Sequence, residues 1–287
     1  MLVEKINKKI SGDNELDANI YLPEGNKKYP GLLISHGFLS GQEEFGDIPE
    51  NLAKQGYVVV TYDFAGHGKS KGDRGYLRSI THLNDAERAL KLLLDQDKTD
   101  KDRVAVIGHS LGTVATIRLI TESELGKKVK LAVLLSPVRK LADSISKIEL
   151  LAYKLAYNIS WPLLLITGKH IYLPYKYAAK DIFLSADAIK KADELKFLQN
   201  SMSINNYAYM ITKIDNEKFA PKIEIPVLVG IAKDDKIVPN KGSEAVYNAI
   251  KTRKEWFEID NSGHSMMTDN NAKKLENKII SWLAENI

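Results

Sequence analysis

Cysteine is absent from all 287 residues of the chain. A chain without thiols can form no disulfide, no thiolate metal site and no cysteine nucleophile. Any covalent chemistry must therefore begin at another side chain, and serine activated by a nearby base is the alternative to look for.

Long uninterrupted apolar runs are also lacking. The most apolar stretch, residues 148–166, contains Glu149, Lys154, Asn158 and Pro162, which argues against a membrane span. The first ten residues alternate apolar and charged side chains, without the apolar core that a secretory signal needs. We therefore expect a cytoplasmic protein.

Neither charge sign is in strong excess. The 41 basic and 37 acidic residues leave a formal net charge of +4, which is too small to indicate a nucleic-acid partner. With 44% hydrophobic and 27% charged residues, the composition is that of a globular protein with a sizeable core. At this length we expect one core domain with an insertion.

Short aliphatic runs alternate with helical patterns along most of the chain. After a hairpin expected within the first 22 residues, the runs predict strands at 31–35, 57–62, 104–108, 131–135, 227–231 and 256–259. Apolar residues spaced three and four apart predict helices at 48–55, 82–94, 111–121, 243–251 and 272–285. Most strand runs are apolar throughout, as in strands covered by helices on each side. The sequence therefore predicts an α/β fold, with a mostly parallel central sheet and helices on both faces.

This alternation is interrupted once, between residues 138 and 220. Helical patterns such as 186–202 follow one another there without clear strands between them. Residues 163–170 are also compatible with a buried strand, and we interpret them as helical. We therefore expect an inserted helical cap at 138–220, on a sheet domain formed by 1–137 and 221–287.

A candidate nucleophile lies directly after one predicted strand. Residues 104–107 lead into Gly108-His109-Ser110-Leu111-Gly112, and a helical pattern follows at once. This context suits a G-x-S-x-G turn, which is so sharp that side chains two residues either side of the serine would collide. The helix behind Ser110 would also direct amide groups and its positive dipole end at an oxyanion. The alternative is a serine in an ordinary helix-capping turn.

A serine of this kind needs a histidine as its base. His264 lies in the loop 261–265 after the last predicted strand, where it would reach the carboxyl edge of the sheet. The remaining histidines either precede the turn, start a helix, belong to the turn itself or lie in the cap: His36, His67, His82, His109 and His170.

The histidine in turn needs a carboxylate on a loop after another strand, between nucleophile and base in chain order. Asp234 and Asp235 both follow the predicted strand 227–231. Either side chain would reach the histidine from a turn, so the local pattern leaves both open.

These segments resemble the α/β-hydrolases grouped around monoacylglycerol lipases, lysophospholipases and serine aminopeptidases. The resemblance covers nearly the whole sheet domain. It rests on His36-Gly37-Phe38, on the segment 62–70 with the sequence Tyr-Asp-Phe-Ala-Gly-His-Gly-Lys-Ser, on the turn around Ser110, and on the aspartate and histidine loops.

The resemblance also implies roles for single residues. The family spacing selects Asp235 over Asp234 as the acid, and it implies an oxyanion hole formed by the Phe38 and Leu111 amides. Asp63, His67 and Gly68 are implied to shape a turn beside the site without doing chemistry.

The implied function is a serine carboxylic-ester hydrolase that acts through an acyl-enzyme on Ser110, with small-molecule acyl esters as substrates and no cofactor or metal. Monoacylglycerol-like or lysophospholipid-like esters of medium to long acyl chain are the expected class. The alternatives are an aminopeptidase or amidase, an esterase for small or aromatic acyl groups, and a non-catalytic binding protein. A free amino terminus calls for acidic residues in the cap, yet residues 138–220 hold twelve basic and eight acidic side chains, a balance of 12 − 8 = +4.

The cap also contains two helical stripes. Tyr153, Tyr157 and Trp161 share one face of a predicted helix, whereas Leu151, Leu155 and Ile159 share another. We expect the aromatic residues to bind the substrate above Ser110, although both stripes would also suit a cap that is only packed core. Lysines beside these rings further suggest lipid contact through the cap.

Overall fold

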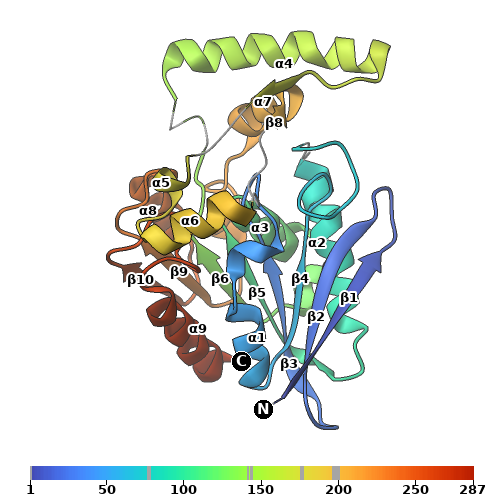
Figure 1. Ribbon diagram of the computed structural model, residues 1–287, viewed down its shortest axis with the longest axis vertical. Helices are drawn as coiled ribbons and strands as arrows, with labels where there is room; N and C mark the ends of the chain where they lie inside the picture. Colours follow the sequence, from blue (N-terminus) through green and yellow to red (C-terminus); the bar gives the residue numbers. More distant parts are fainter. Residues whose placement is uncertain (1, 76–78, 141, 143–144, 175–177, 196–200) are drawn as a thin grey trace.

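A sheet of eight strands forms the centre of the molecule (Figure 1). This computed structural model describes residues 2–75, 79–140, 142, 145–174, 178–195 and 201–287. The strands are β1 (Val3–Ile10), β2 (Leu16–Pro23), β3 (Tyr29–Ser35), β4 (Val58–Tyr62), β5 (Thr99–His109), β6 (Leu131–Leu135), β9 (Val227–Ala232) and β10 (Lys254–Ile259). Their order in the sheet is β1-β2-β4-β3-β5-β6-β9-β10.

The sheet is mostly parallel, as the sequence predicts. Strands β1 and β2 form an antiparallel hairpin, and β2 pairs antiparallel with β4. From β4 to β10 all pairings are parallel. Every residue of β4, β6 and β9 is buried, because helices cover both faces of the sheet.

The two covered faces form two separate cores. On one face α2 (Ser79–Leu94), α3 (Gly112–Glu122) and α8 (Asn240–Ala249) pack on residues such as Leu33. On the other, α1 (Ile48–Lys54) and α9 (Ala272–Asn286) pack on Leu32 and Ile34. Consecutive residues of β3 thus enter opposite cores, as strand geometry requires. The short helices η1 (Gln42–Phe45), η2 (Leu125–Lys128) and η4 (Ala220–Lys222) lie in connecting segments.

Between β6 and β9 the chain leaves the sheet. It forms α4 (Lys147–Thr167), β7 (Tyr172–Pro174), α5 (Ala179–Ile182), α6 (Ala186–Leu195), β8 (Ser201–Ser203) and α7 (Ile204–Lys213). In Figure 1, α4 lies across one end of the molecule, far from both termini. The helix begins at a capping box of Ser146 and Glu149 and ends at Gly168, whose φ of 65° is left-handed.

This segment differs in part from what its sequence predicts. Residues 163–167 are helical, so the helical interpretation of that ambiguous run is confirmed there. The helix expected at 186–202 is described only to Leu195, and Met202 lies in β8 instead. The antiparallel pair β7 and β8 was not expected, because strands of three residues are too short to show a period.

Candidate active site

Strained backbone is concentrated at the carboxyl edge of the sheet. Four non-glycine residues in the described parts of the chain have a left-handed φ: Leu39 (56°), Ser110 (50°), Ser136 (44°) and Asn261 (51°). They follow β3, β5, β6 and β10 respectively. Such conformations cost free energy and persist only where the surrounding structure enforces them, which is common at functional sites.

Ser110 lies on the sharp turn between β5 and α3. A Cβ atom on Gly108 would lie 2.5 Å from the Thr116 Oγ1 atom, and a Cβ atom on Gly112 would lie 2.2 Å from the carbonyl oxygen of Ser35. Both distances are far inside van der Waals contact, so both positions require glycine. This close packing holds the serine at the edge of the sheet.

The site contains two amides available to bind an anion. Within the described chain, neither the Phe38 nor the Leu111 amide donates a hydrogen bond to another residue. Phe38 follows β3 and Leu111 follows the serine at the start of α3. Phe38, Ser110 and His264 line one cavity of about 30 Å³, together with Ile182 and Ile237. This arrangement is compatible with the expected oxyanion hole.

His264 is bonded to Asp235. The Nδ1 atom of the histidine lies 2.7 Å from Oδ2 of Asp235. The Asp235 side chain has no exposed surface and that of His264 is 9% exposed, whereas Asp234 is exposed on the same turn. The geometry therefore places Asp235, and not Asp234, against the histidine.

Three further donors surround the Asp235 carboxylate. The Ser136 hydroxyl donates to Oδ2, and the amides of Ile237 and Val238 donate to Oδ1. Burial alone would raise the pKa of Asp235, but His264 and these amides outweigh burial and hold the pKa below its ordinary value. Asp235 is thus ionised at neutral pH and accepts a hydrogen bond from the Nδ1–H group of His264.

A second buried pair, which the sequence did not reveal, lies beside the first. Oε1 of Glu44 is 3.0 Å from Nδ1 of His109 and 2.8 Å from the amide nitrogen of Gly37. The other ring nitrogen of His109 lies 3.0 Å from the carbonyl oxygen of His264. Glu44 and His109 therefore connect the Phe38 loop, the Ser110 turn and the His264 loop.

The pKa shifts of Glu44 and His109 favour the charged form of each side chain. Burial would raise the pKa of Glu44, but the charge and hydrogen bond of His109, together with smaller effects of His36 and Ser40, outweigh burial and lower the pKa below 4.5. Burial would lower the pKa of His109, but Glu44, together with smaller effects of the His264 carbonyl group and Asp235, outweighs burial and raises the pKa above 6.5. The pair is therefore an ion pair over the range between these values. Its only local sequence signal is a glutamate shortly after His-Gly-Phe.

The turn after β4 is built around the Asp63 carboxylate. The Asp63 carboxylate accepts hydrogen bonds from the amides of Gln42 and Lys69. A Cβ atom on Gly68 would lie 2.2 Å from that carboxylate. His67 is buried beside this turn, and burial holds its pKa well below 6.5.

The aromatic stripe of the cap lies away from the cavity at Ser110. Tyr153 packs edge-on against Tyr207 of α7, with ring centres 5.0 Å apart, and Tyr157 packs against Tyr209 at 6.3 Å. Neither Tyr153, Tyr157 nor Trp161 lines the cavity that contains Ser110. The structure thus brings together the serine, histidine, aspartate and Phe38, and does not add the aromatic residues to them.

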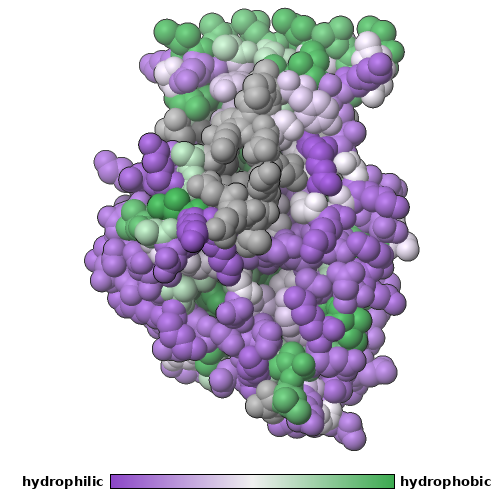
Figure 2. All heavy atoms as spheres, in the orientation of Figure 1, coloured by the Kyte–Doolittle hydropathy of each residue, from purple (hydrophilic) through white to green (hydrophobic). Residues whose placement is uncertain are grey.

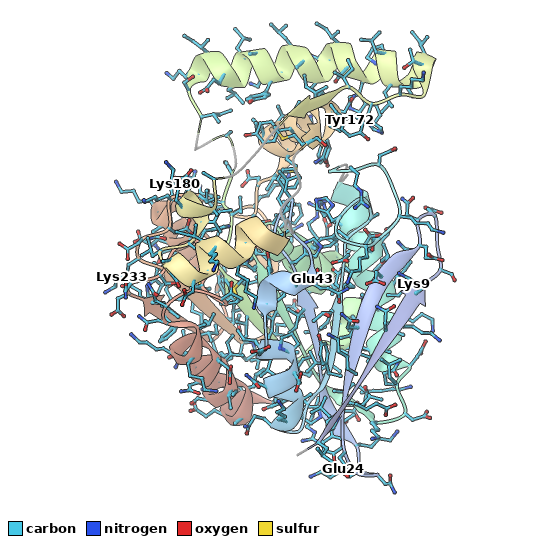
Figure 3. All side chains as sticks on the ribbon, viewed as in Figure 1. Lys9, Glu24, Glu43, Tyr172, Lys180 and Lys233 are labelled. Atoms are coloured by element: carbon cyan, nitrogen blue, oxygen red, sulfur yellow. The ribbon has the colours of Figure 1, made fainter. Side chains whose placement is uncertain are left out.

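A larger cavity of about 410 Å³ shares Glu44 with the first. It lies between η1, α6 and the start of α9, and it includes Glu43, which Figure 3 labels. Ser110 and His264 do not line it. Among the described residues no cluster of three or more His, Asp or Glu side chains could hold a metal ion. In the same residues no helix is both long and apolar enough to cross a bilayer.

Comparison with known proteins identifies the family. Residues 29–271 match the family model described as serine aminopeptidase, S33, which covers most of the chain. The chain belongs to this family. It is a hydrolase with the α/β-hydrolase fold, as the sequence motifs imply.

Individual relatives are distant but extend over nearly the whole chain. An uncharacterized 31.7 kDa protein of Escherichia coli is 24% identical over 273 residues, which cover 88% of this chain and 90% of that one. A monoglyceride lipase homolog of Monkeypox virus is 23% identical over 266 residues, or 89% and 90% of the two chains. The solved structure of a monoacylglycerol lipase from Paleococcus ferrophilus superposes with a TM-score of 0.73 at 21% identity, covering 99% of each chain.

The buried pair makes stability depend on pH. Because the pKa of Glu44 is lowered, its carboxylate stabilises the folded state at pH values above its ordinary pKa of 4.5. Because the pKa of His109 is raised, its ring stabilises the folded state at pH values below its ordinary pKa of 6.5. Glu44→Gln should therefore lower the free energy of unfolding most between these values, by about 3 kcal/mol. The loss should shrink as pH rises through the raised pKa of His109. Urea unfolding of wild type and Glu44→Gln near pH 5.5 and near pH 9 measures the loss at each pH.

Glu43→Gln is the matched control for this experiment. Its side chain is 41% exposed and pairs with Lys69, so its removal should cost less than about 1 kcal/mol at either pH. An equal loss for Glu44→Gln at both pH values would contradict a buried ion pair.

Proposed function

We propose that this protein is a serine carboxylic-ester hydrolase with Ser110 as nucleophile, His264 as general base and Asp235 as the residue that orients the histidine. The observation that carries the proposal is the bond between His264 and the buried Asp235, with Nε2 of the histidine left for a serine in the same cavity. An imidazole held in this tautomer is what activation of a hydroxyl group requires.

The reaction proceeds in two halves. The Ser110 hydroxyl attacks the carbonyl carbon of the ester while His264 takes its proton, and the Phe38 and Leu111 amides stabilise the oxyanion. His264 then gives this proton to the leaving alcohol, and the acyl group stays on the serine. In the second half water attacks the acyl-enzyme, its proton passes through His264 to the serine, and the carboxylic acid leaves.

The substrate class that we propose is an acyl ester such as a monoacylglycerol or a lysophospholipid, with a medium to long acyl chain. Two of the relatives are a monoglyceride lipase homolog and a monoacylglycerol lipase, which supports this class. Phe38, Ile182 and Ile237 give the cavity an apolar wall beside Ser110. A cytoplasmic location stays a prediction from the N-terminal sequence.

One observation favours a second candidate, an esterase for small or aromatic acyl groups. The cavity at Ser110 has a volume of only about 30 Å³, which is room for very few water molecules. A long acyl chain would have to lie mostly outside it. The family name raises a peptidase as a third candidate, but the positive charge balance of residues 138–220 disfavours recognition of a free amino terminus.

The nucleophile can be tested directly. Ser110→Ala should lower kcat for a p-nitrophenyl ester by about a millionfold, because the acyl-enzyme can no longer form. Its thermal unfolding should stay cooperative. A fluorophosphonate probe should label wild-type protein at Ser110, located by peptide mass spectrometry. Labelling at another serine, or near-normal turnover by Ser110→Ala, would refute the assignment.

The two aspartates form a matched pair for the next test. Asp235→Asn should lower kcat by at least about a thousandfold, because the amide leaves His264 in the wrong tautomer. Asp234→Asn should change kcat less than about twofold, because that side chain is exposed. Steady-state hydrolysis of one ester measures both variants. If the effects were reversed, the acid would be Asp234.

A series of p-nitrophenyl esters separates the proposed substrate class from its alternatives. Each methylene group buried on binding contributes about 0.8 kcal/mol, so kcat/KM should rise about fourfold per carbon from acetate to octanoate and then level off. Equal rates for acetate and octanoate would support the small-acyl esterase instead. Faster turnover of aminoacyl anilides than of every ester would support the peptidase.

A further inference from the structure

The outer face of α4 is an exposed apolar stripe. Its members follow one another at spacings of three and four residues, so they lie along one side of the helix. The stripe consists of Ile148, Leu151, Leu155, Ile159, Leu163 and Ile166, which are between 41% and 82% exposed.

No comparable apolar surface occurs elsewhere in the described chain. Of ten large hydrophobic side chains that are exposed, seven belong to α4, namely the stripe and Leu165. Figure 2 shows them as a continuous hydrophobic band along one end of the molecule, above a mostly hydrophilic body. A patch of this kind marks an interaction surface, whereas single exposed residues do not.

The stripe is not needed to hold α4 on the protein. The opposite face of the helix performs that task, because Tyr153 and Tyr157 pack on α7 and Ser160 is buried. Tyr172 of β7, labelled in Figure 3, also lies on the inner side of the helix. The outer face is therefore left for a partner outside the fold.

The charges around the stripe are predominantly positive. Residues 146–170 hold Lys147, Lys154 and Lys169 but only one acidic residue, Glu149, a balance of 3 − 1 = +2. All three lysines are exposed. The Glu149 carboxylate accepts a hydrogen bond from the Ser146 amide in the capping box. Lys147 and Lys154 are seven residues apart and so lie along the same border of the stripe.

The position of α4 suits a broad, flat partner. The helix forms one end of the molecule, with its apolar face turned away from the body (Figures 1 and 2). Its 21 residues extend over about 31 Å, and no other described element projects beyond it in these views. A planar surface can therefore contact the whole stripe at once. Because no described helix is suited to cross a bilayer, this contact would be parallel to the surface.

We infer that the outer face of α4 docks on an anionic lipid surface, with the stripe among the acyl chains and Lys147 and Lys154 at the headgroups. The inference deepens the proposed function and rests on it for the substrate, which would be a lipid ester taken from that surface. Docking itself requires no turnover, so binding and hydrolysis can be measured separately.

Vesicle co-sedimentation tests the docking. Wild-type protein should bind vesicles of phosphatidylcholine and phosphatidylglycerol, and a Leu155→Glu, Ile159→Glu double variant should bind at least about tenfold more weakly. A Lys147→Gln, Lys154→Gln double variant should bind these vesicles about tenfold more weakly than wild type, whereas its affinity for pure phosphatidylcholine vesicles should change little. Leu2→Glu is the matched control, because Leu2 is 74% exposed and precedes β1 at the N-terminus, which Figure 1 marks far from α4. Vesicle binding of this variant should equal that of wild type.

Hydrolysis measured on the same variants completes the test. The Leu155→Glu, Ile159→Glu variant should cleave p-nitrophenyl butyrate in solution as wild type does, but should cleave monoacylglycerol in vesicles more slowly. Stripe-dependent binding without any ester hydrolysis would preserve the docking surface and refute the proposed function.

Two results would overturn docking on lipid. One is an absence of wild-type binding to both kinds of vesicle. The other is a wild-type dimer in sedimentation velocity that the Leu155→Glu, Ile159→Glu variant dissociates, together with no vesicle binding, because the partner would then be a second copy of the chain.

Discussion

The carboxylate of Glu44 is the contact on which the geometry of the site depends. It accepts the Gly37 amide and pairs with His109, whose other nitrogen faces the carbonyl oxygen of His264. Three loops that end three different strands are thereby connected through one buried side chain. Because an unpaired buried charge is strongly destabilising, displacement of any one loop would leave this network incomplete. The left-handed Ser110 is held within this framework.

Two buried histidines face two buried carboxylates in this site, yet only one is suited to act as a base. Both ring nitrogens of His109 have partners, namely Glu44 and the His264 carbonyl group, so this ring can only support structure. His264 has its Nδ1 atom bonded to Asp235, and the residue lines the cavity that contains Ser110. The difference follows from the number of partners around each ring, since a nitrogen already engaged in the core cannot exchange protons with a substrate.

The sheet and its main helices were predictable because strand and helix periods are local properties of the sequence. The residues of the Ser110 turn were predictable for the same reason, since two glycines at fixed spacing report a steric requirement. Asp234 and Asp235 were different, because adjacent residues on one turn are distinguished only by which becomes buried after folding. Glu44 could not be assigned either, because its partner His109 is 65 residues away along the chain.

The orientation of α4 shows a further limit of periodic patterns. The sequence predicts two apolar stripes, but a period defines faces without stating which of them turns inward. The aromatic face packs inward because α7 offers Tyr207 and Tyr209 as ring partners, and ring contacts add to the gain from burial. The aliphatic face is then left toward solvent, where it gains nothing from folding. It follows that the free energy available from burying this face can be realised only through a partner, so α4 packs on α7 with one side and is left to meet another surface with the other.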